Sequence, residues 1–372
     1  MIPVNEPLIG AEELALVQEA VRSGWISSSG PYVEQFERAW ADYCGRKHGI
    51  SVCNGTAALE AAMLALELKP GDEVVLPSFT ILSCVIAVLG AGGTPVLVDA
   101  DPETWCMDVG ATLDRLGPRT RAIMPVHIYG HPVELEPVLA EAQSLGIAIV
   151  EDAAEAHGAE YRLDGVWQRC GSFGDLSTFS FFANKLVTTG EGGMVLTDDD
   201  QLAARLREIR NLGFGSGRRF LHERLGRNFR LTSLQAALGL PQVGRMAEIL
   251  SRKREIAAGY AAGLESAGVV RLQTQREWAR SAHWMVGIVL DDEVPFDAEA
   301  LAQRLRERGV ESRPFFLGMH EQPVLQRLGL FAGAKYPISE RLARRGLYLP
   351  SGVALTDGQQ QAVCAAVLDA LA

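Results

Sequence analysis

The sequence predicts an α/β fold with a mostly parallel central sheet, helices on both faces of that sheet and a smaller C-terminal α+β domain. The chain has 372 residues, enough for two or three domains at roughly 150 residues each. Short apolar runs that end in polar residues or glycine alternate with segments of helical periodicity, a pattern typical of parallel sheets covered by helices. Past about residue 239 this pattern gives way to one long helical segment and shorter elements. We therefore expect a large domain over residues 1–245 and a small domain over residues 246–372.

The first half of the chain supplies most of the predicted sheet. Apolar positions within residues 14–21 predict an amphipathic opening segment, and those after Asn54 predict a helix over residues 54–68 with Asn54 as its N-cap. A further helix is expected over residues 135–145. The predicted strands lie in GDEVVLP, TPVLVD, AIMPVHIYG and IAIVEDAAEA. The run GGMVLTDDD predicts a strand that leads into a capped helix.

The predicted small domain begins with one long helical pattern, AEILSRKREIAAGYAAGL, which would join the two domains. It continues with a strand in MVGIVL and a helix in AEALAQRLRERG. This mixture of short elements favours an α+β arrangement.

Charge and composition exclude several classes of protein. The chain carries 35 Lys and Arg against 46 Asp and Glu, a formal net charge of −11, which argues against general binding of nucleic acid or an anionic membrane. The opening residues lack the pattern of a signal peptide, and no apolar run reaches the roughly 18 residues that span a bilayer. We therefore expect a cytoplasmic protein. The six cysteines have no CxxC spacing, so we expect buried free thiols rather than disulfides or zinc ligands, and we predict no metal site.

Polar residues that close apolar strands are the first candidates for a site, because ligands of parallel α/β sheets bind at the carboxyl ends of the strands. In Ser51–Thr56 a strand end turns through Gly55 into a helix, whose first N–H groups would face an anion. An ordinary capped helix has the same pattern. Asp152 places a carboxylate at the mouth of a buried strand, where a cationic partner is needed, although it could also cap the next segment.

Lys185 follows the aromatic run TFSFFAN, which would bring its amine into apolar surroundings. A desolvated lysine has a lowered pKa and forms a Schiff base with an aldehyde. The alternative is a surface lysine whose stem alone is buried.

The segment over residues 210–230 is strongly basic in an acidic chain, since it holds six arginines and one acidic residue. An anionic ligand would explain this concentration. A solvated loop, or arginines that stack on RNA bases, are the alternatives.

Together these residues call for a ligand with a phosphate, an aldehyde and a protonated ring nitrogen. Pyridoxal 5'-phosphate (PLP) has all three. Lys185 would hold its aldehyde and Asp152 its ring nitrogen, while Gly55, Thr56 and Ser180 would hold its phosphate.

The chain also resembles, almost from end to end, the DegT/StrS family of nucleotide-sugar aminotransferases, which are fold-type I PLP enzymes. The segments that carry this resemblance are GWISSSG, CNGTAALEAAMLAL, GDEVVLPSFT, GGTPVLVDADPETW, IMPVHIYGHP, IVEDAAEAHGAEY, GSFGDLSTFSFFANKLVTTGEGGMV, NFRLTSLQAALGLPQV and GVESRPFF.

The resemblance implies the same roles for Lys185, Asp152 and the three phosphate residues, and it adds Glu155 near the ring hydroxyl of the cofactor. It implies a homodimer with shared active sites, in which Asn228 reaches the phosphate of the neighbouring subunit. It also implies glutamate as amino donor, with pyridoxamine 5'-phosphate as the other form of the cofactor. Ile81 stands where the family usually has an aromatic residue that stacks on the cofactor ring.

Within the family, WISSSG, HIYGHP, TFSFFANKLVTTGEGG and ESRPFF are most similar to enzymes that aminate carbon 4 of GDP-4-keto-6-deoxymannose to GDP-perosamine. FFLGMH replaces the more usual proline-containing stretch before His320. The residues expected to contact this substrate are Trp25, Ser29, His127, Arg219, Arg313 and His320.

Other reactions stay open at this point. They include amination at carbon 3, amination of a UDP- or dTDP-linked keto sugar or of a keto-octulosonate, and a regulatory protein that keeps the fold without turnover. Lys185 argues against a dehydratase, because dehydratases of the family carry histidine at that position. A nicotinamide-dependent oxidoreductase is disfavoured because no GxGxxG follows the first strand.

Overall fold

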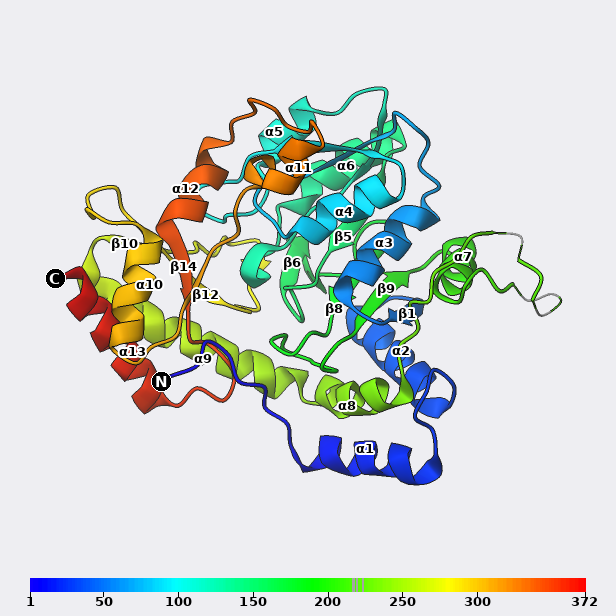
Figure 1. Cartoon of the computed structure of the whole chain (residues 1–372), viewed down its shortest axis with the longest axis horizontal. Helices are drawn as coiled ribbons and strands as arrows, with labels where there is room; N and C mark the ends of the chain where they lie inside the picture. The colour runs from blue at the N-terminus through cyan, green and yellow to red at the C-terminus, as the bar shows by residue number, and fades with distance from the viewer. Residues whose placement is uncertain (216–217, 219, 223) are drawn as a thin grey trace.

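The computed structural model describes residues 1–215, 218, 220–222 and 224–372 (Figure 1). Within these residues the central sheet has seven strands in the order β1-β9-β8-β5-β4-β2-β3. Pairing is parallel from β8 through β3, and β9 runs antiparallel to both of its neighbours. The predicted α/β class with a mostly parallel sheet is therefore confirmed. The strands are β1 (His48–Val52), β2 (Glu73–Pro77), β3 (Thr94–Val98), β4 (Thr120–Ile123), β5 (Ala148–Asp152), β8 (Leu176–Ser180) and β9 (Gly193–Thr197).

Because β9 is antiparallel to both β1 and β8, those two strands point the same way. The carboxyl ends of β1, β5 and β8 therefore lie along one edge of the sheet, and the first residue of β9 lies there too. The sequence elements predicted to form a site thus reach a common edge.

Helices that pack on or near this sheet come mainly from the first two thirds of the chain. Helix α2 packs on β1, α3 packs on β8 and β9, and α1 packs on α8. These helices are α1 (Ala11–Ser23), α2 (Pro31–Cys44), α3 (Gly55–Ala65), α4 (Leu82–Gly90), α5 (Val109–Asp114), α6 (Leu135–Leu145), α7 (Asp200–Arg210) and α8 (Ser233–Gly244), with a 3-10 turn at Ile128–Gly130.

The helix starts follow the predicted caps. The Asn54 side chain accepts a hydrogen bond from the Ala57 N–H at 2.8 Å, and Asp199 caps α7 in the same way. Helix α6 has the predicted bounds, whereas α3 ends at Ala65 instead of residue 68. The chain leaves the helix there, because Glu67 has a left-handed φ of 52° that cannot continue an α-helix.

The C-terminal part has its own antiparallel sheet, in the order β10-β12-β14-β13, and a separate apolar core that includes Ile256, Tyr260, Leu301 and Val367. Helices α9, α10 and α13 gather at one end of the molecule, near both termini (Figure 1). The elements are α9 (Met246–Leu264), β10 (Val270–Leu272), β12 (Val286–Leu290), α10 (Ala298–Glu307), β13 (Arg313–Pro314), α11 (Pro323–Arg327), α12 (Pro337–Arg345), β14 (Gly346–Leu349) and α13 (Asp357–Leu371), with 3-10 turns at Glu265–Ala267 and Met319–Glu321.

The predicted boundary at 245/246 falls between α8 and α9, and the division into two domains stays a prediction. Backbone pairings are among the contacts that cross it. Ile2 forms a bridge with Val310, so the first residues lie on the C-terminal part. A small sheet pairs β11 (Ala279–Arg280) with β6 (Glu160–Leu163), which in turn pairs with β7 (Val166–Arg169).

All six cysteines are free thiols, as predicted, and only Cys53 is partly exposed. Among the helices that the structure describes, none combines the length and the apolar character needed to cross a membrane.

Candidate functional site

A cavity of about 680 Å³ opens at the common edge of the central sheet. Its floor comes from the ends of β5 and β8 and from the start of α3, and residues from the C-terminal part close one side. The lining contains most of the residues predicted to hold a cofactor, namely Gly55, Thr56, Ile81, Asp152, Glu155, Ser180 and Lys185.

Lys185 lies five residues beyond the end of β8, and its side chain is only 10% exposed. Its amine lies 3.4 Å from the centre of the Trp284 ring and 3.9 Å from Oε1 of Glu155. Burial lowers the pKa of Lys185, and the nearby Glu155 and Asp152 carboxylates act in the opposite direction. The lysine is therefore a desolvated amine, as the aromatic run predicts.

Asp152 ends β5 and is buried. Its Oδ1 accepts from the Ala154 N–H at 3.1 Å, and its Oδ2 accepts from the thiol of Cys84 at 3.3 Å. Since the thiol donates to the carboxylate, the contact of 3.3 Å between Cys84 and Thr80 has the threonine hydroxyl as donor. Burial raises the pKa of Asp152, while these hydrogen bonds and the charge of Lys185 lower it.

Glu155 lies on the loop that follows β5 and faces the same cavity. Its Oε2 accepts a hydrogen bond of 2.8 Å from the Tyr129 N–H. Tyr129 has a left-handed φ of 54°, a conformation that costs energy in a residue with a side chain. Burial raises the pKa of Glu155 to about 7, and the nearby Lys185 amine opposes that shift.

The start of α3 forms a cradle for an anion. The first intrahelical bond runs from Ala58 N–H to the Asn54 carbonyl, so the preceding N–H groups of Gly55 and Thr56 are free of the helix ladder. A Cβ on Gly55 would lie 2.7 Å from the Cβ of Ser180, so glycine is required for this close approach. Thr56 Oγ1 lies 2.8 Å from the hydroxyl of Ser83 at the start of α4. These donors fit a phosphate group.

Ile81 caps α4 at the cavity and is 48% exposed, which leaves its aliphatic side chain available to cover a planar ligand. It lacks an aromatic face, so it offers contact area without the aromatic stacking term of about 0.5 to 1.5 kcal/mol.

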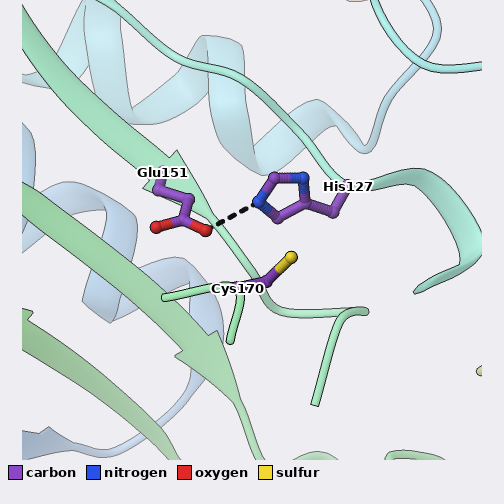
Figure 2. Close-up of side chains that lie close together, drawn as sticks. All are labelled: His127, Glu151 and Cys170. Atoms are coloured by element: carbon purple, nitrogen blue, oxygen red, sulfur yellow. Dashed lines mark hydrogen bonds and ion pairs between the residues drawn. The ribbon is translucent and has the colours of Figure 1, made fainter. Parts of the chain in front are cut away.

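His127 lies apart from the cavity, in a buried network with Glu151 and Cys170 (Figure 2). Its Nδ1 accepts from the Val133 N–H at 2.9 Å, so the proton is on Nε2, which donates to Glu151 at 2.8 Å. Glu151 also accepts from the N–H groups of Gly171 and Phe173. Possible metal-binding atoms of the three side chains lie within 4.8 Å of one another, but both imidazole nitrogens are engaged in the fold. This geometry does not favour the predicted substrate contact of His127.

Three other predicted substrate residues lie outside the cavity lining. His320 is buried, with Nδ1 2.8 Å from the hydroxyl of Ser78 and Nε2 3.1 Å from Glu340. Arg313 is exposed and lies opposite Tyr348, a cavity residue, across the β13–β14 pair. Trp25 is 45% exposed on the surface.

Ser29 lines a separate cavity of about 510 Å³ that also contains Arg207, Arg210 and Arg230. Asn228 is exposed and lies outside both cavities, paired with Asn211. Arg219 lies outside the described residues. Part of the chain between α7 and α8 projects beyond α7 (Figure 1), while Phe229 is hydrogen-bonded to Cys53 in the body of the molecule. Contacts of this segment with a second subunit stay a prediction.

Several cavity residues escaped the sequence analysis. Cys84 lies behind the cavity lining and directly contacts Asp152, but a cysteine in an apolar helix gives no signal of that contact. Trp284, Phe316 and Tyr348 come from the C-terminal part and close the cavity. Tyr348 lies near the end of an apolar strand, a pattern that could have identified it, whereas Trp284 and Phe316 lie outside the strands.

Known proteins resemble this chain over nearly its whole length. The model of the DegT/DnrJ/EryC1/StrS aminotransferase family matches residues 7–368. The chain is 40% identical to GDP-perosamine synthase of Caulobacter vibrioides over 98% of this chain and 97% of the relative. It is 38% identical to GDP-perosamine synthase of Escherichia coli O157:H7 over 98% and 97% of the two chains. The crystal structure of the aminotransferase TlmJ from Streptoalloteichus hindustanus superposes with a TM-score of 0.91, at 32% identity and with 100% of this chain and 99% of that chain covered.

Proposed function

Because the chain belongs to the DegT/DnrJ/EryC1/StrS aminotransferase family, we propose that it transfers an amino group from glutamate to a nucleotide-linked 4-keto-6-deoxy sugar with PLP as cofactor. The substrate we propose is GDP-4-keto-6-deoxymannose, which would give GDP-perosamine. The observation that carries the proposal is the meeting of Lys185, Asp152 and the Gly55–Ser180 cradle in one cavity.

These residues fit PLP by their chemistry. When bound, PLP withdraws electrons from the carbon that carries the amino group, which makes the proton on that carbon acidic. The free N–H groups of α3 and the hydroxyl of Ser180 would bind the phosphate, and the Lys185 amine would bind the aldehyde. Asp152, held by two hydrogen bonds, would keep the ring nitrogen protonated.

Lys185 has a second role in the proposed reaction. A desolvated amine with a lowered pKa can accept a proton from the substrate carbon and return it as an acid. Glu155, whose pKa is raised to about 7, would lie near the ring hydroxyl and could share a proton with it. The cavity of about 680 Å³ is within the range of small-molecule sites, roughly 300 to 1,000 Å³.

The choice of sugar nucleotide rests on the relatives, two of which are named GDP-perosamine synthase. A working homodimer is part of this proposal. Asn228, which is exposed in the single chain, and the arginines of residues 210–230 would then contribute to the site of the second subunit. Roles of Trp25, Ser29, Arg313 and His320 in substrate binding stay predictions, because none of the four lines the cavity.

The test is an assay with purified protein, PLP, glutamate and a panel of GDP-, UDP- and dTDP-linked keto sugars, with the new amine located by NMR. We expect turnover with GDP-4-keto-6-deoxymannose and amination at carbon 4. K185A should lose both turnover and the visible absorbance of bound PLP, whereas K69A, at an exposed lysine, should keep both. Turnover by K185A would overturn the mechanism, and turnover of another sugar alone would overturn the substrate assignment.

A further inference from the structure

A second lysine is buried close to the site without a carboxylate partner. Lys253, on α9, is 1% exposed, although lysine is seldom fully buried. Its amine donates to the carbonyl of Trp284 at 2.9 Å and to the carbonyl of Ser351. Among the described residues, no carboxylate lies within ion-pair distance of Lys253. The cost of burying this amine is therefore offset by two backbone carbonyls, one of which belongs to a cavity residue.

Trp284 is held at three points by two segments, α9 and the loop after β8. Its carbonyl accepts from Lys253 on α9, and its indole N–H donates to the Asn184 carbonyl at 2.8 Å. The face of its ring lies 3.4 Å from the Lys185 amine. The ring is 5% exposed, so its position is fixed by these contacts and by packing, without a solvent-facing alternative.

We propose that Trp284 is a positioning residue for Lys185, anchored by Lys253, and that its indole face stabilises the ammonium form of the Lys185 amine. This inference rests on the proposed role of Lys185 as the reacting amine. Whenever the Lys185 amine is not bound to the cofactor aldehyde, it would lie against the Trp284 ring. The ring would thereby keep the amine close to the reacting carbon.

The protonation of Lys185 is a balance of effects with opposite signs. Burial favours the free amine, while Glu155 and Asp152 favour the ammonium. His157 also lies near, but burial lowers its pKa to about 3, so it is uncharged at neutral pH. The face of an indole ring attracts a cation, and more strongly in desolvated surroundings. A residue that must first accept and then donate a proton needs such a balance near neutral pH.

Lysine NMR can measure this effect directly, because the chain has only five lysines, at positions 47, 69, 185, 253 and 335. The full chain would be labelled with ¹³Cε-lysine, freed of PLP and titrated with pH, and the Lys185 signal would be assigned with K185R. W284L keeps an apolar neighbour but has no aromatic face, so it should lower the pKa of Lys185 by roughly 0.5 to 1.5 units. W284F keeps an aromatic face and should give a smaller shift.

K253M removes the anchor of Trp284 and should shift the Lys185 pKa in the same direction as W284L. K69M, at an exposed lysine, is the matched control and should leave it unchanged. Unfolding curves check that each variant is folded. If K253M does not fold, the Lys185 pKa values of W284L and W284F test the inference. A Lys185 pKa in W284L within about 0.2 units of the parent would overturn the inference.

The outcome is separable from the proposed function. If the Lys185 pKa shifts as expected but no keto sugar is aminated, only the proposed function fails. If sugars are aminated but W284L leaves the pKa unchanged, only the role of Trp284 fails.

Discussion

Replacing His127 by alanine should cost stability rather than substrate affinity. The variant leaves the buried N–H of Val133 without its acceptor and removes one of the three donors to the buried Glu151 carboxylate. Each loss of this kind costs about 1 to 3 kcal/mol, and a hydrogen bond to a charged group is at the upper end. The unfilled volume of the imidazole adds to this cost. We expect a loss of roughly 3 to 5 kcal/mol in the free energy of unfolding, a large part of the about 5 to 15 kcal/mol of a folded domain.

Urea unfolding of the PLP-free protein, followed by circular dichroism and tryptophan fluorescence, measures this loss. The matched control is H222A, since His222 is exposed and its ring contacts the Leu212 carbonyl and the Phe214 ring at the surface. That variant should stay within about 0.5 kcal/mol of the parent. A direct substrate contact predicts the opposite result. If H127A unfolds like the parent while the KM for the sugar nucleotide rises about tenfold, our assignment of His127 to the fold is wrong.

Three further predictions concern the proposed cofactor site. G55A adds a Cβ 2.7 Å from that of Ser180 and should weaken PLP binding at least about tenfold in a spectroscopic titration. The control G90A, with no atom within 4 Å of the added Cβ, should bind PLP normally. Equal affinities of the two variants would contradict the role of Gly55 in the phosphate cradle. Burial raises the pKa of Glu155 to about 7 from 4.5, so the folded PLP-free chain binds more protons than the unfolded chain between these values and loses stability as pH rises through them. E155Q should flatten this part of the curve of unfolding free energy against pH, and an unchanged slope would refute the shift. C84V removes the thiol that donates to Asp152 and should weaken PLP binding about tenfold. The control C84S keeps a donor and should bind PLP normally. Normal PLP binding by C84V would show that the thiol is not needed.

The residues of the cavity floor could be predicted from the sequence because each follows an apolar strand or starts a helix. Lys185, Asp152 and Gly55 lie far apart in the chain, but parallel strands bring their carboxyl ends to one edge, so a strand pattern is enough to group them. The sequence analysis did not predict that β9 runs antiparallel to its neighbours. The grouping is unaffected, because β1 and β8 are both antiparallel to β9 and therefore run in the same direction.

The remaining side of the cavity depends on packing between distant segments, which periodicity does not encode. Trp284 reaches the site because α9 and the loop after β8 hold it from two directions. His127 shows the reverse error. It lies in the predicted strand segment AIMPVHIYG, but its side chain points into the interior toward Glu151, and neither a strand pattern nor a motif resemblance predicts that direction.

The arginine-rich segment carries less free charge than its composition suggests. Arg210 pairs with Glu37, and Arg224 pairs with Glu67, so these two arginines fix the segment against the body of the molecule. Arg230 donates to Asn211 within the segment. Among the arginines of residues 210–230 that the structure describes, only Arg218 and Arg227 bind neither a carboxylate nor a side-chain amide. If the proposed sugar nucleotide binds to this segment, Arg218 and Arg227 are therefore the described arginines left to meet its diphosphate. Arg210 and Arg224, although equally basic in sequence, are neutralised by carboxylates of the body of the molecule.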